Sequence, residues 1–84
     1  MFYVYLLESG SQRYIGSTKD LKRRIEEHNS GQNQSTKAYR PWTLVFYEAY
    51  PESSDAIRRE KYLKTNPGRQ ALSRMLRDYY SKKD

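Results

Sequence analysis

No cysteine occurs in this chain of 84 residues, so its fold depends on one small hydrophobic core. A domain of this size buries only about 60–65% of the surface that its unfolded chain exposes. The lack of cysteine also excludes disulfide bonds and thiolate metal ligands, which often stabilise short chains with small cores. The sequence therefore predicts a single domain over residues 1–84.

The composition is polar, but it is not that of a disordered chain. Apolar residues make up 36% of the sequence, whereas nine tyrosines supply large side chains that bury well, and disordered chains are poor in aromatics. The single histidine, His28, excludes a zinc site with several histidines. The longest apolar run, Phe2 to Leu7, is too short to span a bilayer and has no basic segment before it. We therefore expect a soluble, cytoplasmic domain without a membrane partner.

The first sixteen residues have the pattern of a β-hairpin. Aromatic and β-branched residues occupy Phe2 to Glu8, the pattern resumes from Arg13 to Gly16, and the turn residues Gly10-Ser11 lie between the two runs. The predicted hairpin therefore turns at Gly10-Ser11.

This turn fixes which residues face each other across the hairpin. It pairs Leu7 with Tyr14 and Tyr5 with Gly16. Because side chains alternate along a strand, Tyr3, Tyr5, Leu7 and Tyr14 are expected on one face. Gly16 is expected to leave room for a ligand to approach the backbone.

The rest of the chain alternates between helical and extended patterns. The first predicted segments are a helix from Ser17 or Thr18 to about Asn29, a polar loop from Gly31 to Pro41 and a strand from Trp42 to Tyr50. A second helix follows, which is capped by Ser53, Ser54 or Asp55 and ends near Lys64. A third helix begins at Pro67, with its apolar positions between Ala71 and Tyr80, and residues Ser81 to Asp84 form a frayed tail. The order ββαβαα predicts an α+β fold, with a small, mainly antiparallel sheet packed by helices.

The charge of the chain favours a polyanion as partner. Sixteen Lys and Arg against ten Asp and Glu give a net charge of +6, and nucleic acid is the simplest polyanion that such a surface binds. A basic surface that is merely solvated is the alternative. The residues expected to contact nucleic acid are Lys37 and Arg40 in the polar loop and Lys64 after the second helix. On length alone, that loop fits a functional segment and a disordered connector equally well.

Glu60 interrupts the apolar stripe of the helix that ends near Lys64. At about 100° per residue, Glu60 falls at about 40° from Ala56 and Leu63 at about 340°. An unpaired charge buried there would cost several kcal/mol, so Glu60 needs a cation or a proton. A metal ion and a buried salt bridge to an arginine both satisfy this need.

On the first helix, an arginine and the histidine lie next to the buried face. With Leu21 as the origin, Ile25 falls at about 40°, Arg24 at about 300°, His28 at about 340° and Arg23 at about 200°. Arg24 is thus placed to reach over the sheet toward the two tyrosines, where a guanidinium suits bidentate binding of phosphate. His28, taken alone, is more typical of a hydrogen-bonded structural histidine.

Four segments in this order resemble the GIY-YIG nuclease superfamily, in particular its small stand-alone members related to the nuclease domain of the bacterial excision-repair incision subunit. The segments are Tyr3-Val4-Tyr5, Tyr14-Ile15-Gly16, Asp20 to His28, and Arg59 to Lys64. The resemblance runs from about Phe2 to Leu76, and its strength lies in the ordered combination. Tyr3-Val4 replaces the Gly-Ile of the first motif, and the family's late asparagine has no counterpart, since Asn66 follows Glu60 too closely.

The resemblance implies a small three-stranded antiparallel sheet flanked by helices. It also implies a metal-dependent endonuclease that hydrolyses DNA in DNA repair, with branched or otherwise structured DNA as a candidate substrate. The family's catalytic positions correspond here to Tyr5, Tyr14, Arg24, His28 and Glu60. Glu60 would hold one divalent ion, Mg²⁺ or Mn²⁺, and Arg24 would bind the phosphate. Tyr5 or Tyr14 would position or deprotonate the attacking water, with His28 assisting.

Two other functions fit the residues without the resemblance. One is a nucleic-acid-binding module without catalysis, and the other is a protein-interaction domain with a basic surface. The presence of all five family residues favours the enzyme over both. A small-molecule ligand is not expected.

Overall fold

The computed structural model describes residues 1–82. Its elements are β1 (Phe2–Ser9), β2 (Gln12–Thr18), α1 (Leu21–Ser30), a short 3₁₀ helix η1 (Lys37–Tyr39), β3 (Thr43–Tyr50), α2 (Ser53–Leu63), α3 (Asn66–Met75) and α4 (Arg77–Lys82). The three strands form one antiparallel sheet in the order β2-β1-β3. This confirms the predicted α+β architecture.

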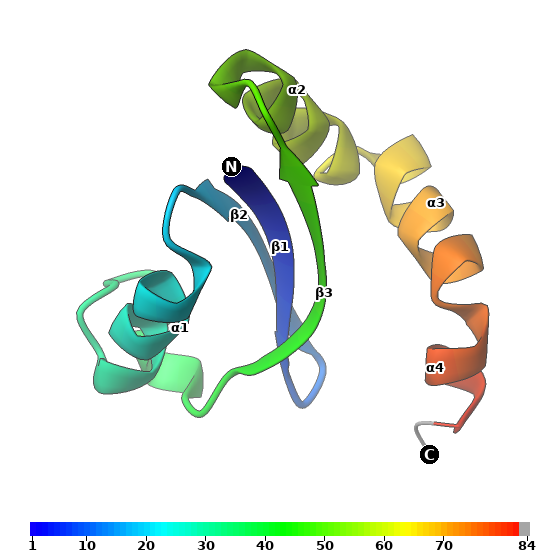
Figure 1. The fold of residues 1–84 in the computed structure, drawn as a ribbon. Helices are drawn as coiled ribbons and strands as arrows, with labels where there is room; N and C mark the ends of the chain where they lie inside the picture. The colour runs from blue at the N-terminus through cyan, green and yellow to red at the C-terminus, as the bar shows by residue number, and fades with distance from the viewer. Residues whose placement is uncertain (83–84) are drawn as a thin grey trace.

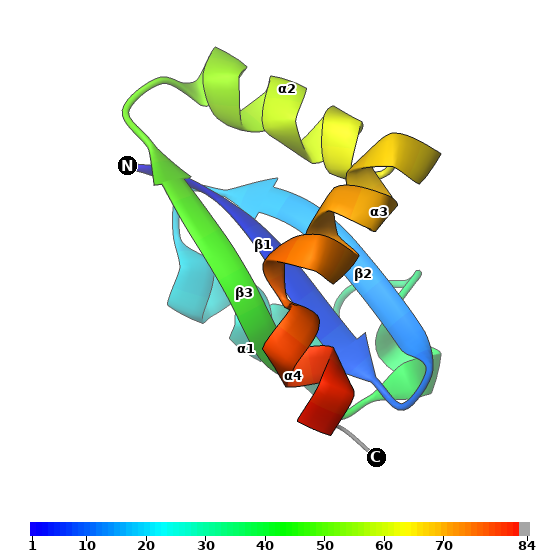
Figure 2. The ribbon, with the colours of Figure 1, turned by 90° about the vertical axis from the view of Figure 1, so that its right-hand side faces the viewer.

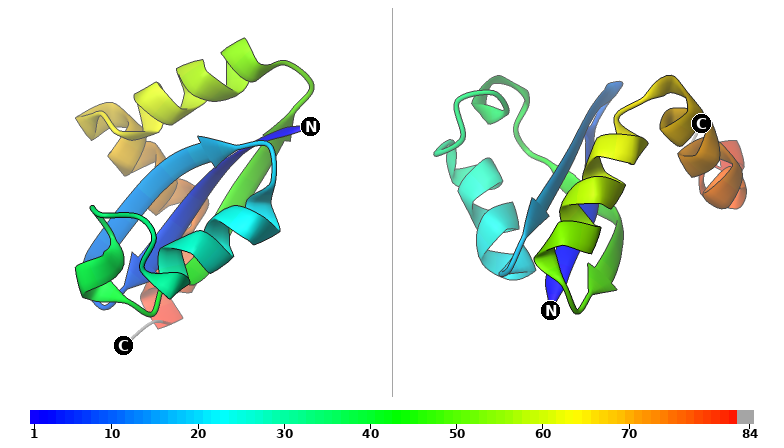
Figure 3. Two further views of the ribbon diagram at one scale, coloured as in Figure 1. Left: turned by 90° about the vertical axis from the view of Figure 1, so that its left-hand side faces the viewer. Right: turned by 90° about the horizontal axis from the view of Figure 1, so that it is seen from above.

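The sheet is covered on both faces (Figure 1). Figure 2 shows α3 and α4 over one face, and the left panel of Figure 3 shows α1 and the loop after it over the other. Alternation along β1 divides the core accordingly. One cluster contains Val4, Leu6, Ile15, Ala56, Leu63 and Leu72. The other contains Tyr5, Leu7 and Trp42, with Tyr14, Leu21, Ile25 and Leu44 packed against it.

The hairpin has the predicted register. Leu7 pairs with Tyr14 and Tyr5 with Gly16, and Gly10 adopts a φ of 59°, which an L side chain rarely takes. The expected space for a ligand at Gly16 is wrong, however. A Cβ atom on Gly16 would lie 2.6 Å from the Tyr5 hydroxyl oxygen. Glycine is therefore needed at this position to admit the Tyr5 phenol.

Helix α1 begins later than predicted. Strand β2 continues to Thr18, which pairs with Tyr3, so neither Ser17 nor Thr18 caps the helix. The cap is Asp20, whose Oδ1 accepts a hydrogen bond of 3.1 Å from the backbone N–H of Arg23. The strand pairing outweighs the capping preference of Ser17 and Thr18.

Helix α2 begins slightly earlier than predicted, because its N-cap is Glu52 rather than one of the next three residues. Helix α3 is capped by Thr65, whose Oγ1 accepts a hydrogen bond of 3.2 Å from the N–H of Gly68. Pro67 is its second residue rather than its first. None of the helices in the described part of the chain is long and apolar enough to cross a membrane.

The C-terminal helix was predicted as one piece but consists of two. The backbone leaves helical geometry at Leu76, and α4 follows directly. The hydroxyls of Tyr79 and Tyr80 then reach the buried Glu8, at 3.0 Å from Oε1 and 2.6 Å from Oε2. Ser81 and Lys82, predicted to fray, belong to α4, while the last two residues of the predicted tail lie outside the described chain.

Candidate active site

Tyr5 and His28 form the buried centre of the site. The Tyr5 hydroxyl lies 2.9 Å from Nε2 of His28, and Nδ1 of His28 lies 2.8 Å from the hydroxyl oxygen of Thr36. The Thr36 hydroxyl itself donates to the carbonyl oxygen of Asn33. The simplest assignment of the hydrogens therefore places one on Nδ1 and leaves Nε2 to accept from Tyr5.

Both groups are uncharged at neutral pH. Burial raises the pKa of Tyr5 well above its usual value, and the nearby Tyr14 raises it further, while Arg24 acts in the opposite direction through its charge and hydrogen bonding. Burial also lowers the pKa of His28, and the positive charge of Arg24 lowers it further, against the opposing effect of Glu27. The pair is thus a phenol that donates to a neutral imidazole.

Tyr14 packs against the same pair. Its ring centroid lies 4.7 Å from that of His28, in an edge-to-face arrangement, and 6.2 Å from that of Tyr5. The two tyrosines therefore share the face of the hairpin that is covered by α1, as the register predicts.

Arg24 and Arg23 differ as the helical wheel predicts. The Arg24 side chain is 38% exposed and that of Arg23 is 75% exposed, although both form ion pairs with Glu27, at 3.2 and 3.1 Å. Of these two arginines, Arg24 is the one that lowers the pKa of Tyr5. A surface pocket of about 340 Å³ opens at this point. Its lining residues are Thr18, Lys19, Asp20, Arg23, Arg24 and Glu27. Arg24 can therefore meet an anion that enters from solvent.

Glu60 is partly buried and is held by two partners. Its Oε1 accepts a hydrogen bond of 2.6 Å from Ser17, and its Oε2 one of 2.8 Å from Nζ of Lys64. Burial alone would raise the pKa of Glu60, but the hydrogen bonds from Lys64 and Ser17 outweigh it and lower the pKa below its usual value. The ion pair is thus with a lysine, not with the arginine considered above. The carboxylate remains ionised at neutral pH.

The tyrosines and Glu60 meet at the edge strand β2. The Tyr5 hydroxyl lies against Gly16 on one face of the sheet. The next residue, Ser17, bonds Glu60 from α2 on the other face. The negative charge of Glu60 contributes to the raised pKa of Tyr5, so the two groups lie within electrostatic range. Gly16 and Ser17 are adjacent in β2, so this short stretch of strand links the two groups.

The donor set at Glu60 fits a metal that keeps much of its water. Within the described chain, no group of three or more His, Cys, Asp and Glu side chains could hold a metal ion. One ionised carboxylate, with the Ser17 hydroxyl beside it, fits Mg²⁺, which typically binds through one or two carboxylates, water and substrate phosphate.

The three residues expected to contact nucleic acid lie in two different places. Lys64 lies beside the candidate metal ligand, because its Nζ forms an ion pair with the Glu60 carboxylate. Lys37 and Arg40 are exposed in the loop after α1, where the Arg40 side chain donates to the Lys37 carbonyl. Figure 1 shows this loop at the end of α1 that lies away from α2. The fold therefore does not bring Lys37 and Arg40 next to Glu60.

Two site residues were missed by the sequence reasoning. The prediction placed Ser17 at the start of the first helix. In the structure Ser17 belongs to strand β2, and its side chain points toward Glu60 of α2. Thr36, which fixes the His28 ring, lies in a polar loop without periodicity. No local pattern distinguishes Thr36 from its neighbours.

A family model described as "GIY-YIG catalytic domain" matches residues 1–72. The chain therefore belongs to the GIY-YIG catalytic domain family, a nuclease-type family whose members in general use divalent metals and act on nucleic acid.

Among its relatives are small stand-alone members of this family. UPF0213 proteins of Staphylococcus aureus strains Mu3 and N315 are 42% identical to the chain over 65 residues, which cover 75% of this chain and 79% of each relative. The solution NMR structure of a UPF0213 protein from Bacillus halodurans has 34% sequence identity and a TM-score of 0.55, and the match covers 89% of this chain and 85% of that one. The fold assignment is thus supported by sequence and by structure.

Proposed function

We propose that this protein is a metal-dependent endonuclease that hydrolyses phosphodiester bonds in DNA. The observation that carries the proposal is the hydrogen bond between the Tyr5 hydroxyl and Nε2 of His28, beside Arg24 and at the strand edge that also holds Glu60. A fold that needed only a core would not require a buried phenol–imidazole pair next to a cation and a carboxylate.

Arg24 binds the scissile phosphate in this proposal. Its guanidinium is partly exposed beside an open pocket and is oriented by Glu27. A planar fork of N–H donors matches two phosphate oxygens and neutralises the charge that develops on them during the reaction.

Tyr5 and His28 together accept the proton of the attacking water. The Tyr5 O–H already donates to Nε2, so the phenol oxygen takes a proton from water while its own proton passes to Nε2. The resulting hydroxide attacks phosphorus, and the P–O bond to the leaving oxygen breaks. The leaving oxygen takes up a proton from solvent, and His28 returns its extra proton to solvent. Because the pKa of Tyr5 is raised, a free phenolate is disfavoured, and this transfer avoids it. Tyr14, packed on His28, keeps both rings in place.

Glu60 would hold the divalent ion, Mg²⁺ or Mn²⁺, with Ser17 beside it. When bound, such an ion stabilises the negative charge on the leaving oxygen. Lys64 shields the Glu60 carboxylate until substrate and metal are present. The cell compartment in this proposal is the cytoplasm, and the substrate is structured DNA of the kind that repair nucleases cut.

The purified protein should be incubated with nicked, branched, flapped and single-stranded DNA, in Mg²⁺, in Mn²⁺ and in EDTA. We expect cleavage of at least one of these DNAs that EDTA abolishes. Binding without cleavage in either metal would contradict the enzyme and identify a non-catalytic nucleic-acid-binding module. Absence of binding would favour the basic protein-interaction domain instead.

A further inference from the structure

A groove of about 470 Å³ lies between strand β2 and the start of α3, on the face of the sheet opposite to α1. Its lining residues are Ser11, Arg13, Tyr14, Ile15, Lys64 and Arg69. Three of them are cations, and each cation comes from a different element or its end: β2, the C-terminus of α2 and α3. None of the lining residues is acidic.

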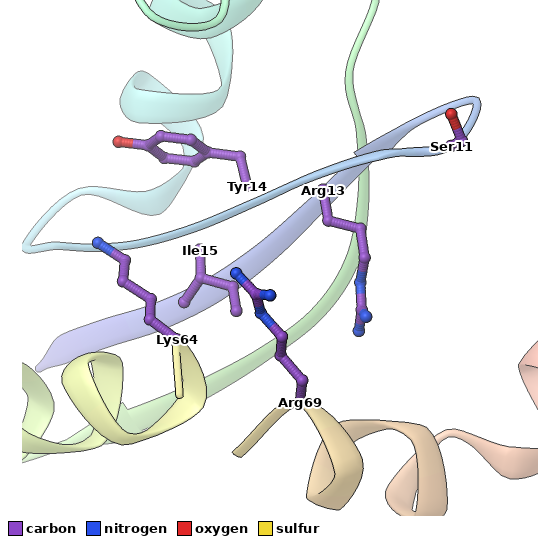
Figure 4. Close-up of a pocket in the computed structure, with 6 residues that line it drawn as sticks. All are labelled: Ser11, Arg13, Tyr14, Ile15, Lys64 and Arg69. Carbon is purple, nitrogen blue, oxygen red and sulfur yellow. The ribbon is translucent and has the colours of Figure 1, made fainter. Parts of the chain in front are cut away.

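The cations form a row. In Figure 4, Lys64, Arg69 and Arg13 follow one another along β2 toward the hairpin turn that carries Ser11, with Ile15 between Lys64 and Arg69. Their order leads away from the candidate active site, because Nζ of Lys64 lies 2.8 Å from the Glu60 carboxylate.

Arg69 lies in the middle of this row and has no counterion among the described residues. Within residues 1–82, no ion pair involves its guanidinium, and the hydrogen bonds of Arg69 use only its backbone, which accepts from Ser73 and donates to Thr65. The residue is exposed. Its full positive charge is therefore offered to solvent inside the groove.

Arg13 is held in place at the far end. Its guanidinium lies 3.7 Å from the Glu8 carboxylate and 5.4 Å from the centre of the Tyr80 ring. The Glu8 carboxylate also accepts hydrogen bonds from Tyr79 and Tyr80, so its charge is shared among several donors. The position of Arg13 is thus fixed before any ligand arrives, which reduces the entropy lost on binding.

From this row we infer that the groove binds the phosphate backbone of the nucleic acid that is cut, on one side of the scissile bond, with Arg69 as the central contact. The inference rests on the proposed function for the identity of the ligand. The groove offers cations and a hydroxyl to a ligand. The one aromatic residue among its lining residues is Tyr14, and Figure 4 shows the Tyr14 ring on the opposite side of β2. The lining residues therefore offer no aromatic ring on which a base could stack. Contacts of this type position a strand without reading its sequence.

Arg69→Gln tests this inference, with Arg74→Gln as the matched control. Arg74 is exposed on the same helix, lines a different pocket and likewise forms no ion pair within the described chain, so both variants lose one charge from α3. The measurement is the binding of a fluorescein-labelled nicked DNA duplex by anisotropy, in EDTA, over a series of salt concentrations. Thermal unfolding of both variants should match the wild type.

We expect Arg69→Gln to weaken binding about threefold to tenfold and to reduce the slope of log affinity against log salt by about 0.9, the effect of one lost phosphate contact. Arg74→Gln should change affinity less than twofold, and Arg69→Lys should restore most of the slope. Equal losses of DNA affinity in the two glutamine variants would contradict the inference that the groove binds the phosphate backbone. Absence of DNA binding by the wild type would contradict it as well. Because the assay contains no metal, it gives its answer whether or not the protein cleaves DNA.

Discussion

Arg23 and Arg24 are adjacent, carry the same charge and share Glu27 as an ion-pair partner, yet only Arg24 reaches the Tyr5 phenol. If Arg24 binds the scissile phosphate, its planar fork matters as well as its charge. Arg24→Lys should therefore lower the single-turnover cleavage rate by about 10²–10³, the scale of removing one transition-state donor. Arg23→Lys should stay near the wild-type rate. Equal cleavage rates in the two variants would show that Arg24 does not bind the scissile phosphate.

The position of Arg24 was predictable because a helix repeats regularly once its buried face is known. Leu21 and Ile25 defined that face, and the exposed fractions of Arg23 and Arg24 follow it. The partners of His28 and Glu60 were not predictable in the same way. Thr36 and Ser17 reach them across turns of the chain, and no periodicity within one element encodes such contacts.

Side-chain hydrogen bonds connect the loop between α1 and β3 to the end of α1. The Asn29 side chain bonds both the carbonyl and the N–H of Trp42, at 3.1 and 2.6 Å, and Nε1 of Trp42 donates to the Thr36 carbonyl at 2.8 Å. His28 completes this network through Thr36. The interpretation of the loop as a disordered connector is therefore wrong.

This network should make stability depend on pH. The pKa of His28 is lowered in the folded protein, so the unfolded chain takes up a proton near pH 6.5 that the folded protein does not yet bind. The free energy of unfolding should then fall as the pH drops below about 6.5, by about 1.4 kcal/mol for each unit by which the pKa is lowered.

Urea unfolding of the wild type and of His28→Gln at pH 7.5, 6.5 and 5.5 measures this effect. The carboxyl groups with lowered pKa, Glu48 and Glu60, titrate below this range and do not interfere. The wild type should lose stability between the two lower pH values, while the variant, although less stable throughout, should lose much less. Parallel curves for the two proteins would show that His28 does not titrate as described.

Across the whole molecule, the element order and the sheet could be predicted because short-range patterns determine them. The turn at Gly10-Ser11 fixed the hairpin register, and alternation along β1 divided the core between its two faces. The break at Leu76 could not be predicted from local pattern, and the residues after it contact the distant Glu8, whose carboxylate accepts from the hydroxyls of Tyr79 and Tyr80. The space at Gly16 was misjudged for the same reason, since a residue on the neighbouring strand fills it.

In the proposed mechanism one carboxylate, Glu60, binds the metal, while phosphate contacts elsewhere on the surface bind DNA. Glu60→Gln keeps the size of the side chain and an acceptor for Ser17, so the fold should persist. The control is Glu26→Gln, at an exposed glutamate of α1 with no ion pair in the described structure.

The most direct measurement is single-turnover cleavage of the preferred DNA in Mg²⁺ by the wild type and both variants, with DNA affinity measured in parallel. Glu60→Gln should abolish cleavage while its affinity stays within about threefold of the wild type, because most affinity comes from phosphate contacts elsewhere, and Glu26→Gln should cleave normally. Cleavage by Glu60→Gln within about threefold of the wild-type rate would show that Glu60 does not hold a catalytic metal ion, since the loss of a sole metal ligand should lower the rate far more.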